Sequence, residues 1–178
     1  MRKLLENICT NGTFASVYTN SENTERFQYG QILAVNDARY AMVLVSPDGD
    51  YDGIISGFTR EIFRVSIEDQ YHEKMQKMMA LSKTSFFLPL IDSNRIDRSL
   101  LLAAQKHGKI VSLELKDSGI GDVTGFVEDV SGTVCRIHEI DEYGRDDGHS
   151  YVELESISHI SLDTDDEQRI LRLYQPRS

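Results

Sequence analysis

Short runs in which hydrophobic and polar residues alternate fill most of the chain between residues 13 and 67. Alternation over four to eight residues is typical of half-buried β-strands. The runs predict five strands, at Thr13–Thr19, Phe27–Val35, Arg39–Val45, Ile54–Phe58 and Ile62–Ile67. Apolar residues at helical spacing predict a helix at Arg2–Ile8, before the first strand, and another at Glu68–Leu81, after the last.

The same pattern occurs a second time, about 95 positions later. Residues Gly30–Asp69 align without a gap on Gly125–Thr164, with seven identical residues and with the apolar positions in step. Arg2–Ser16 aligns on Arg98–Ser112 at an offset of 96. This period is far longer than the roughly 20 to 50 residues of a solenoid repeat. The alignment therefore predicts two copies of one small domain.

The alignment of the two copies divides the chain into a first domain at residues 1–82, a linker at 83–96 and a second domain at 97–178. The linker contains Phe86, Phe87, Leu88 and Leu90, and is too apolar for a solvated segment. We expect it to lie extended against one of the domains. Near the end of the second copy, the spacing of Thr164 and Glu167 predicts a capping box at the start of a helix.

The predicted fold class is mainly β with flanking helices. Each copy is expected to form a small, strongly bent five-stranded β-barrel with an N-terminal and a C-terminal helix. Gly30 and its counterpart Gly125 lie inside the second strand of each copy, where glycine often marks a tight bend. A small closed barrel requires such curvature.

Charge and composition narrow the classes of partner. The net charge is −10. Most of it lies after Lys83, where the chain has 10 basic and 18 acidic residues. An acidic surface repels phosphate backbones, which disfavours DNA and nonspecific nucleic-acid binding. No apolar run approaches the roughly 18 residues of a membrane span, and the N-terminal residues do not resemble a signal peptide. Cys9 and Cys135 show no disulfide or CxxC pattern, so we expect a cytoplasmic protein with two buried thiols.

The order of helix, five strands, bent second strand and tight turn at Asn36 resembles the Sm-like (LSm) small barrels. The glycine of the second strand, Ile32, Val35, the Asn36 turn and Ile55-Ser56-Gly57 look like parts of the two Sm motifs. SH3-like and Tudor-like barrels are the nearest alternatives. The resemblance implies ring assembly through edge strands. It also implies a possible binding surface for single-stranded RNA at Asn36, Arg39, Tyr40, Ser56 and Gly57, although the residues that usually hold the base in that family are absent.

Metal binding and catalysis have weaker signals. Asp48, Asp50 and Asp52 match the first half of an EF-hand loop, but the acid at its twelfth position is missing, so we predict a turn and no metal. His138 and His149 are placed to face each other near Asp146 and Asp147. No nucleophile elbow, P-loop or zinc spacing occurs, so we predict no catalysis and no cofactor.

The leading functional prediction is a non-catalytic binding or scaffold protein. Its partner is expected to be another protein, or a second copy, bound through edge strands. The alternative is an RNA-binding protein that uses the less acidic first copy. An uncharacterised enzyme is the third possibility.

Overall fold

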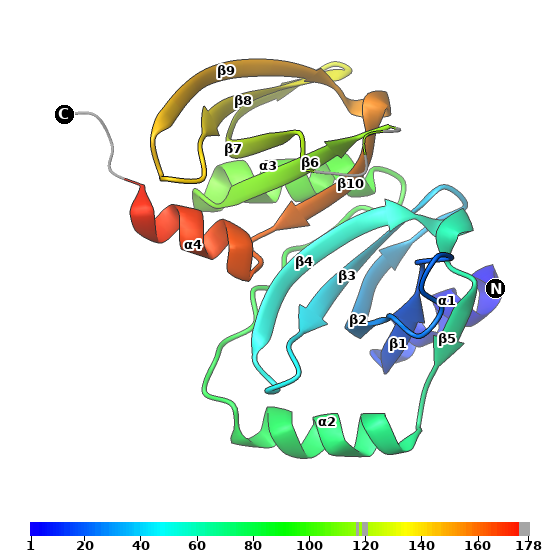
Figure 1. Cartoon of the computed structure of the whole chain (residues 1–178). Helices are drawn as coiled ribbons and strands as arrows, with labels where there is room; N and C mark the ends of the chain where they lie inside the picture. Colours follow the sequence, from blue (N-terminus) through cyan, green and yellow to red (C-terminus); the bar gives the residue numbers. More distant parts are fainter. Residues whose placement is uncertain (117, 119–120, 175–178) are drawn as a thin grey trace. The chain divides into compact units, whose positions relative to one another are not determined.

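The computed structural model of the chain describes residues 1–116, 118 and 121–174 (Figure 1). It contains two compact units, Met1–Ile96 and Asp97–Ser178. The first contains α1 (Arg2–Asn11), β1 (Phe14–Tyr18), β2 (Gln28–Val35), β3 (Arg39–Val45), β4 (Tyr51–Phe58), the 3-10 turn η1 (Thr59–Glu61), β5 (Arg64–Ser66) and α2 (Gln70–Leu81). The same order follows in α3 (Ile96–His107), β6 (Ile110–Leu115), β7 (Val123–Ser131), β8 (Val134–Ile140), β9 (Asp146–Glu153), η2 (Leu154–Ser156), β10 (Ile157–Leu162) and α4 (Asp165–Leu173).

The prediction of two closed barrels is wrong. In the first unit the antiparallel strand order is β5-β1-β2-β3-β4, and in the second unit it is β10-β6-β7-β8-β9. A closed barrel has no edge strand, whereas the order in the first unit ends at β5 and the order in the second ends at β9. Alternation along a strand indicates which side chains face the core, but it does not indicate whether the first and last strands of a set meet. Each unit is therefore an α+β fold with an open antiparallel sheet and helices, and the Sm-like, SH3-like and Tudor-like barrel assignments are wrong.

The strand pairs within the two units have corresponding registers. In the first unit Gly30 lies opposite Leu44, and in the second Gly125 lies opposite Glu139. Each pair then shifts register, between Ile32 and Ala34 or between Val127 and Asp129. Adding 95 to the residue numbers of the first pair gives those of the second. The repeat in the sequence thus coincides with a repeat in backbone pairing.

Gly30 and Gly125 lie where two strands approach too closely for a side chain. A Cβ atom at Gly30 would be 1.8 Å from the carbonyl oxygen of Val43, and one at Gly125 would be 2.0 Å from that of His138. A second pair, Gly49 and Gly144, shows the same correspondence. A Cβ at Gly49 would meet the backbone of Met78 in α2, and one at Gly144 would meet the backbone of Leu173 in α4. Glycine is thus required for these backbones to pack at their observed separation.

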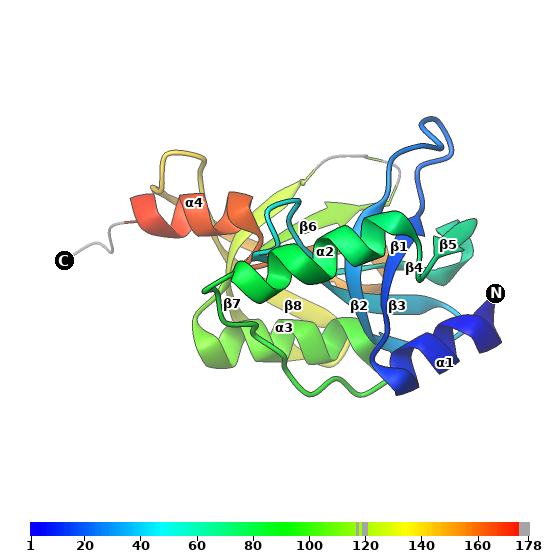
Figure 2. The same cartoon turned by 90° about the horizontal axis from the view of Figure 1, so that it is seen from below.

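The first unit packs hydrophobic residues on both faces of β2. Ile32 belongs to a cluster with Leu5 and Ile8 of α1. Tyr29 faces the other way and packs with Val45 and Met75 of α2, which crosses the strands in Figure 2. Successive side chains of a strand point to opposite faces, so the two helices cover different faces of one strand.

The predicted capping box of α4 is present. Glu167 accepts a hydrogen bond from the backbone nitrogen of Thr164 at 2.8 Å. Its carboxylate is only 3% exposed and also accepts a hydrogen bond from Ser112 of β6 at 2.7 Å. One acid therefore caps the helix and ties it to the sheet of its own unit.

The linker residues 83–96 belong to the first compact unit. The backbone nitrogen of Tyr51 donates to Thr84 at 2.9 Å, and the ring of Phe86 lies edge-on to that of Tyr51 at 5.7 Å. Farther along, the carbonyl of Ser93 accepts from the side-chain amide of Asn36 at 2.6 Å. The boundaries 1–82, 83–96 and 97–178 remain predictions. Among the described helices, none is long and apolar enough to cross a membrane.

Cys135 is a fully buried thiol on β8, and burial raises its pKa from 9.0 to about 11. Below pH 9 the thiol is protonated in both the folded and unfolded states, so its contribution to stability is fully present. Between pH 9 and 11 the unfolded chain loses a proton that the folded chain keeps. We expect the free energy of unfolding to fall by up to about 2 kcal/mol over this range.

Urea unfolding followed by circular dichroism at pH 7.5, 9 and 10.5 measures this loss. Cys135→Ala is the matched comparison because it removes the ionisable group, so its stability should fall less steeply with pH. Parallel pH dependences for the two proteins would contradict the assignment to Cys135.

Candidate functional site

The residues predicted to bind RNA lie around the β2–β3 turn and the β3–β4 pair. Their side chains are engaged in hydrogen bonds and packing within the first unit. The side-chain oxygen of Asn36 accepts from the backbone nitrogens of Ala38 and Arg39, both at 2.8 Å. Asn36 therefore closes the turn between β2 and β3. The amide nitrogen of Asn36 donates to the carbonyl of Ser93, so both ends of the side-chain amide are bonded within the first unit.

Tyr40 is 1% exposed and lies in the hydrophobic cluster beneath α1. Burial, with a smaller effect from the charge of Glu61, raises the pKa of its hydroxyl. Gly57 pairs with Tyr40 across β3 and β4. The tyrosine ring is therefore part of the core, and a base can stack on it only if that core opens.

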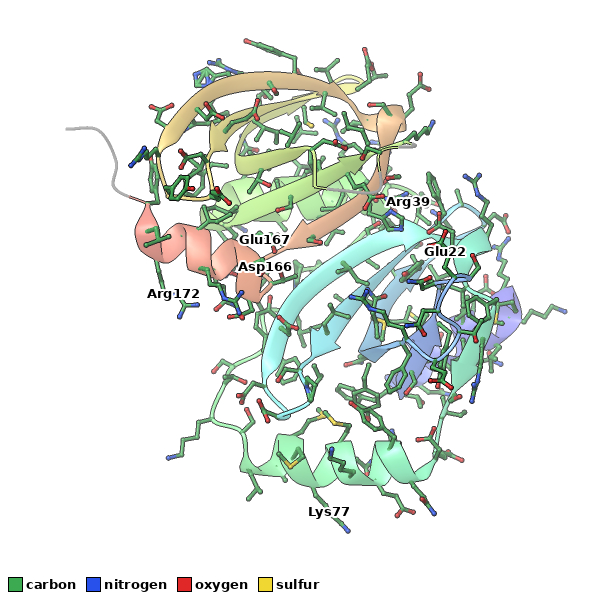
Figure 3. All side chains as sticks on the ribbon, viewed as in Figure 1. Glu22, Arg39, Lys77, Asp166, Glu167 and Arg172 are labelled. Atoms are coloured by element: carbon green, nitrogen blue, oxygen red, sulfur yellow. The ribbon has the colours of Figure 1, made fainter. Side chains whose placement is uncertain are left out.

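Arg39 and Ser56 are also buried, and Arg39 donates to the hydroxyl of Ser56 at 3.2 Å. The guanidinium carbon lies 4.6 Å from the centre of the Phe58 ring. Figure 3 shows Arg39 among the side chains of the first unit. The five predicted residues are close together, but as parts of a packed strand pair, so RNA binding by them would require that pair to open.

The three aspartates that resemble half an EF-hand loop have separate environments. Asp48 lies in the turn before β4, whereas Asp52 is within β4 itself. Asp50 accepts a hydrogen bond from the hydroxyl of Ser82 at 2.5 Å, at the end of α2. Across residues 1–116, 118 and 121–174, no group of three or more His, Cys, Asp or Glu side chains is arranged to hold a metal ion.

His138 and His149 lie directly opposite each other on β8 and β9, with ring centres 5.2 Å apart. His138 Nε2 is 3.0 Å from the carboxylate of Asp146, so the acid beside this histidine is Asp146. The rings of Phe126 and Tyr174 also lie near His138. His138 thus lies among an acid, a second imidazole and two aromatic rings.

The exposed edge strand β9 is the first candidate binding surface. It has eight residues, pairs with β8, and lies at one end of the strand order (Figure 1). Tyr151 on this strand is 69% exposed. The guanidinium carbon of Arg136 lies 5.7 Å from the centre of its ring, and Arg136 pairs with Glu128 at 2.8 Å. The strand thus presents backbone groups beside an exposed tyrosine and an arginine.

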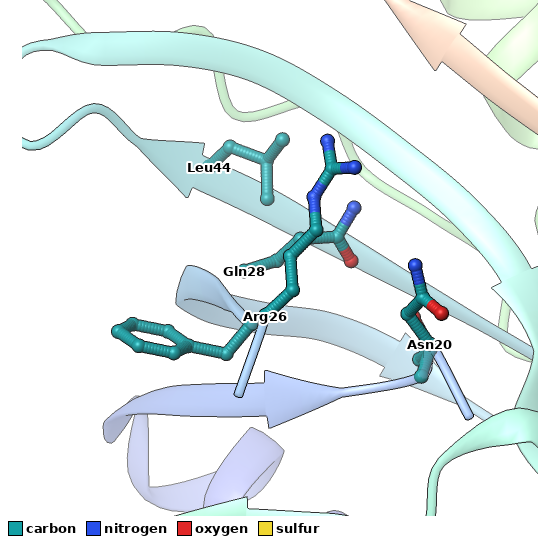
Figure 4. Close-up of a pocket in the computed structure, with 6 residues that line it drawn as sticks. Asn20, Arg26, Gln28 and Leu44 are labelled. Carbon is teal, nitrogen blue, oxygen red and sulfur yellow. The ribbon is translucent and has the colours of Figure 1, made fainter. Parts of the chain in front are cut away.

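The second candidate is a cavity of about 390 Å³ in the first unit (Figure 4). Gln28 begins β2, Leu44 lies on β3, and the remaining lining residues belong to the connection between β1 and β2. The cavity is lined by Thr19, Asn20, Arg26, Phe27, Gln28 and Leu44. No sequence pattern predicted this pocket, because the polar residues between β1 and β2 are those of an ordinary turn.

One signal in the sequence could have indicated this pocket, because its residues differ between the two copies. Gln28 aligns with Val123, and Leu44 aligns with Glu139. The first position is polar only in the first copy, and the second position is polar only in the second copy. Such exchanges indicate a role that only one copy has.

No protein-family model matches the chain, and no curated protein or solved structure matches it. Function is therefore inferred from the geometry of the two candidate sites.

Proposed function

We propose that the chain is a non-catalytic binding protein whose edge strand β9 binds an extended segment of a partner protein. The observation that carries the proposal is the eight-residue strand at the end of the sheet order, with most of its side chains exposed. An extended segment that joins a sheet edge gains affinity from main-chain hydrogen bonds and specificity from alternate side chains.

The composition of β9 favours its use over the edge strand β5 of the first unit. β5 has only three residues, and a short edge strand is one way in which proteins avoid unwanted pairing. β9 is longer and contains no proline. Its exposed Tyr151, beside Arg136, combines two residue types that dominate the energy of many protein interfaces.

Charge favours a basic partner over a second copy of the chain. Residues 97–178 contain 9 basic and 17 acidic residues, for a net charge of −8. Acidic residues occur on or beside β9 at Asp146, Asp147, Glu153 and Glu155. Pairing two β9 strands would bring like charges together, which destabilises a strand pair. A segment that carries lysine or arginine would be attracted instead.

A cytoplasmic setting fits this role. Cys9 and Cys135 are both free thiols, and unpaired cysteines are usual in a reducing compartment.

We expect isotope-labelled full-length protein to bind an eight-residue peptide of alternating lysine and valine. Amide resonances of β9 should shift in nuclear magnetic resonance titrations, and the affinity should fall as salt is added because the attraction is partly electrostatic. Tyr151→Ala should weaken binding about tenfold or more, as expected when a central aromatic residue is removed from an interface.

The matched control is Tyr143→Ala, because Tyr143 is 63% exposed but lies in the turn before β9. It should leave the affinity unchanged. A peptide with glutamate in place of lysine should not bind. Equal binding of both peptides, or no β9 shift, would refute the proposal; shifts that depend on protein concentration without peptide would indicate self-association instead.

A further inference from the structure

We propose that the first unit contains a binding pocket for a small monocarboxylate that also carries a hydroxyl or amino group. The pocket is the cavity of about 390 Å³ beside β2 and β3, and it is independent of β9. Its volume lies within the roughly 300 to 1,000 Å³ of small-molecule sites. Such sites combine apolar walls with a few polar groups that orient the ligand, and this cavity has both.

Arg26 supplies the positive charge. Its side chain is exposed, and within the described residues its guanidinium makes no ion pair. Its backbone nitrogen donates to the carbonyl of Asn23 at 3.1 Å, which holds the loop that carries it. A guanidinium has a planar, forked set of donors that matches a carboxylate. The ligand group best suited to Arg26 is therefore a carboxylate.

The side-chain amides of Asn20 and Gln28 indicate which polar group the ligand carries besides its carboxylate. The side-chain oxygen of Asn20 accepts from the backbone nitrogens of Glu22 and Asn23, both at 3.0 Å, which leaves its amide nitrogen as a donor. The side-chain oxygen of Gln28 is buried, and none of the residues that the structure describes donates a hydrogen bond to it. A buried acceptor without a donor is unfavourable. A ligand hydroxyl or amino group placed beside Gln28 would satisfy it.

These polar groups converge on one space. In Figure 4 the side chains of Arg26, Gln28 and Asn20 extend into the same pocket. Leu44 and Phe27 supply apolar surface for a short hydrocarbon segment of the ligand.

The charge of the surroundings favours a singly charged ligand. Arg26 is the cation among the six lining residues, and Glu22 and Glu25 lie in the same loop. The whole chain has a net charge of −10. A dianion such as phosphate would be repelled more strongly than a monocarboxylate.

The second unit provides an internal comparison. Its residues at the positions of Gln28 and Leu44 are Val123 and Glu139. Valine removes the amide, and a glutamate would repel a carboxylate. The proposed site therefore belongs to the first unit alone.

The test uses the full chain and four probes: 3-hydroxybutyrate, L-leucine, L-leucinamide and inorganic phosphate. Amide resonances of residues 19–28 and 44 should shift with at least one of the two carboxylates at millimolar concentration. L-Leucinamide lacks the carboxylate and should not shift them. Phosphate should bind at least tenfold more weakly than the better carboxylate.

Substitutions test the role of each group. Arg26→Gln should weaken carboxylate binding at least tenfold, and Gln28→Leu should weaken it several-fold. Lys77→Gln is the matched control, because it removes the same charge from an exposed position on α2, and it should leave binding unchanged.

The proposal is overturned if neither carboxylate shifts these residues at 10 mM, if L-leucinamide shifts them equally, or if phosphate binds more tightly. An unchanged affinity in Arg26→Gln would also overturn it. Failure here is distinguishable from failure of the β9 proposal, because that site is measured from different resonances and with a different probe.

Discussion

Replacing Gly125 by alanine is expected to destabilise the second unit by more than about 3 kcal/mol. The new Cβ would be 2.0 Å from the carbonyl oxygen of His138 and 2.8 Å from its carbonyl carbon. Those atoms belong to the paired strand β8, so the backbone itself must move and the β7–β8 pairing must loosen. Gly30→Ala should have an effect of similar size in the first unit, where the corresponding distance to Val43 is 1.8 Å.

Thermal and urea unfolding of the full chain measure the effect, with separate probes in the two units because they need not unfold together. The control is Gly132→Ala. Gly132 also lies in the second unit and has a positive φ of 54°, but a Cβ there would meet nothing within 4 Å. Its cost should be only the about 1 to 2 kcal/mol of a left-handed alanine. If Gly125→Ala costs no more than Gly132→Ala, close strand approach is not the reason for the glycine.

Local structure was predictable where neighbouring residues determine it. The third strand, Arg39–Val45, has the predicted bounds. The fourth strand begins at Tyr51, three residues before the predicted start, because Asp52-Gly53 resembles a turn in sequence. Gly53 has a positive φ of 77°, yet it remains inside the strand. The turn-like residues are thus an irregularity within a paired strand.

Closure of the sheet was not predictable from these patterns. The expected fifth strand ran from Ile62 to Ile67, but only Arg64–Ser66 forms a strand, and it pairs with β1. Three residues offer few backbone groups for a second neighbour. The hydrophobic pattern could not show this, because Phe63 and Ile67 have the residue types of a buried strand but are partly exposed.

The candidate sites also depend on contacts between residues that are distant in the sequence, which local patterns do not predict. The resemblance to Sm-like barrels placed Tyr40 on a possible RNA-binding surface. β3 is buried along nearly its whole length, so alternation does not distinguish a surface face from a core face. The pocket beside Arg26 depends on a loop that brings Asn20, Gln28 and Leu44 together from three places in the chain. Turn propensity in the sequence carries no information on that convergence.

Tyr40→Ala is expected to destabilise the first unit by about 3 to 5 kcal/mol, the usual cost of removing a large aromatic ring from a core. Tyr40→Phe keeps the ring and should cost less than about 1.5 kcal/mol. The difference follows from burial, because the ring packs with residues of α1 and with Met42 and is 1% exposed. Urea unfolding of the three proteins measures it.

The same variants test whether Tyr40 binds RNA. Stacking on a base requires an exposed aromatic face and is usually worth about 1 to 3 kcal/mol per base. A buried ring offers no such face, so uridine-rich RNA should show no saturable binding to the wild-type chain at low salt, and Tyr40→Phe should behave identically. Saturable binding that survives in Tyr40→Phe but is lost in a folded Tyr40→Leu protein would show that the core opens to RNA. That result would make the ring a binding residue despite its burial, and the stability cost of Tyr40→Ala would then measure only part of its role.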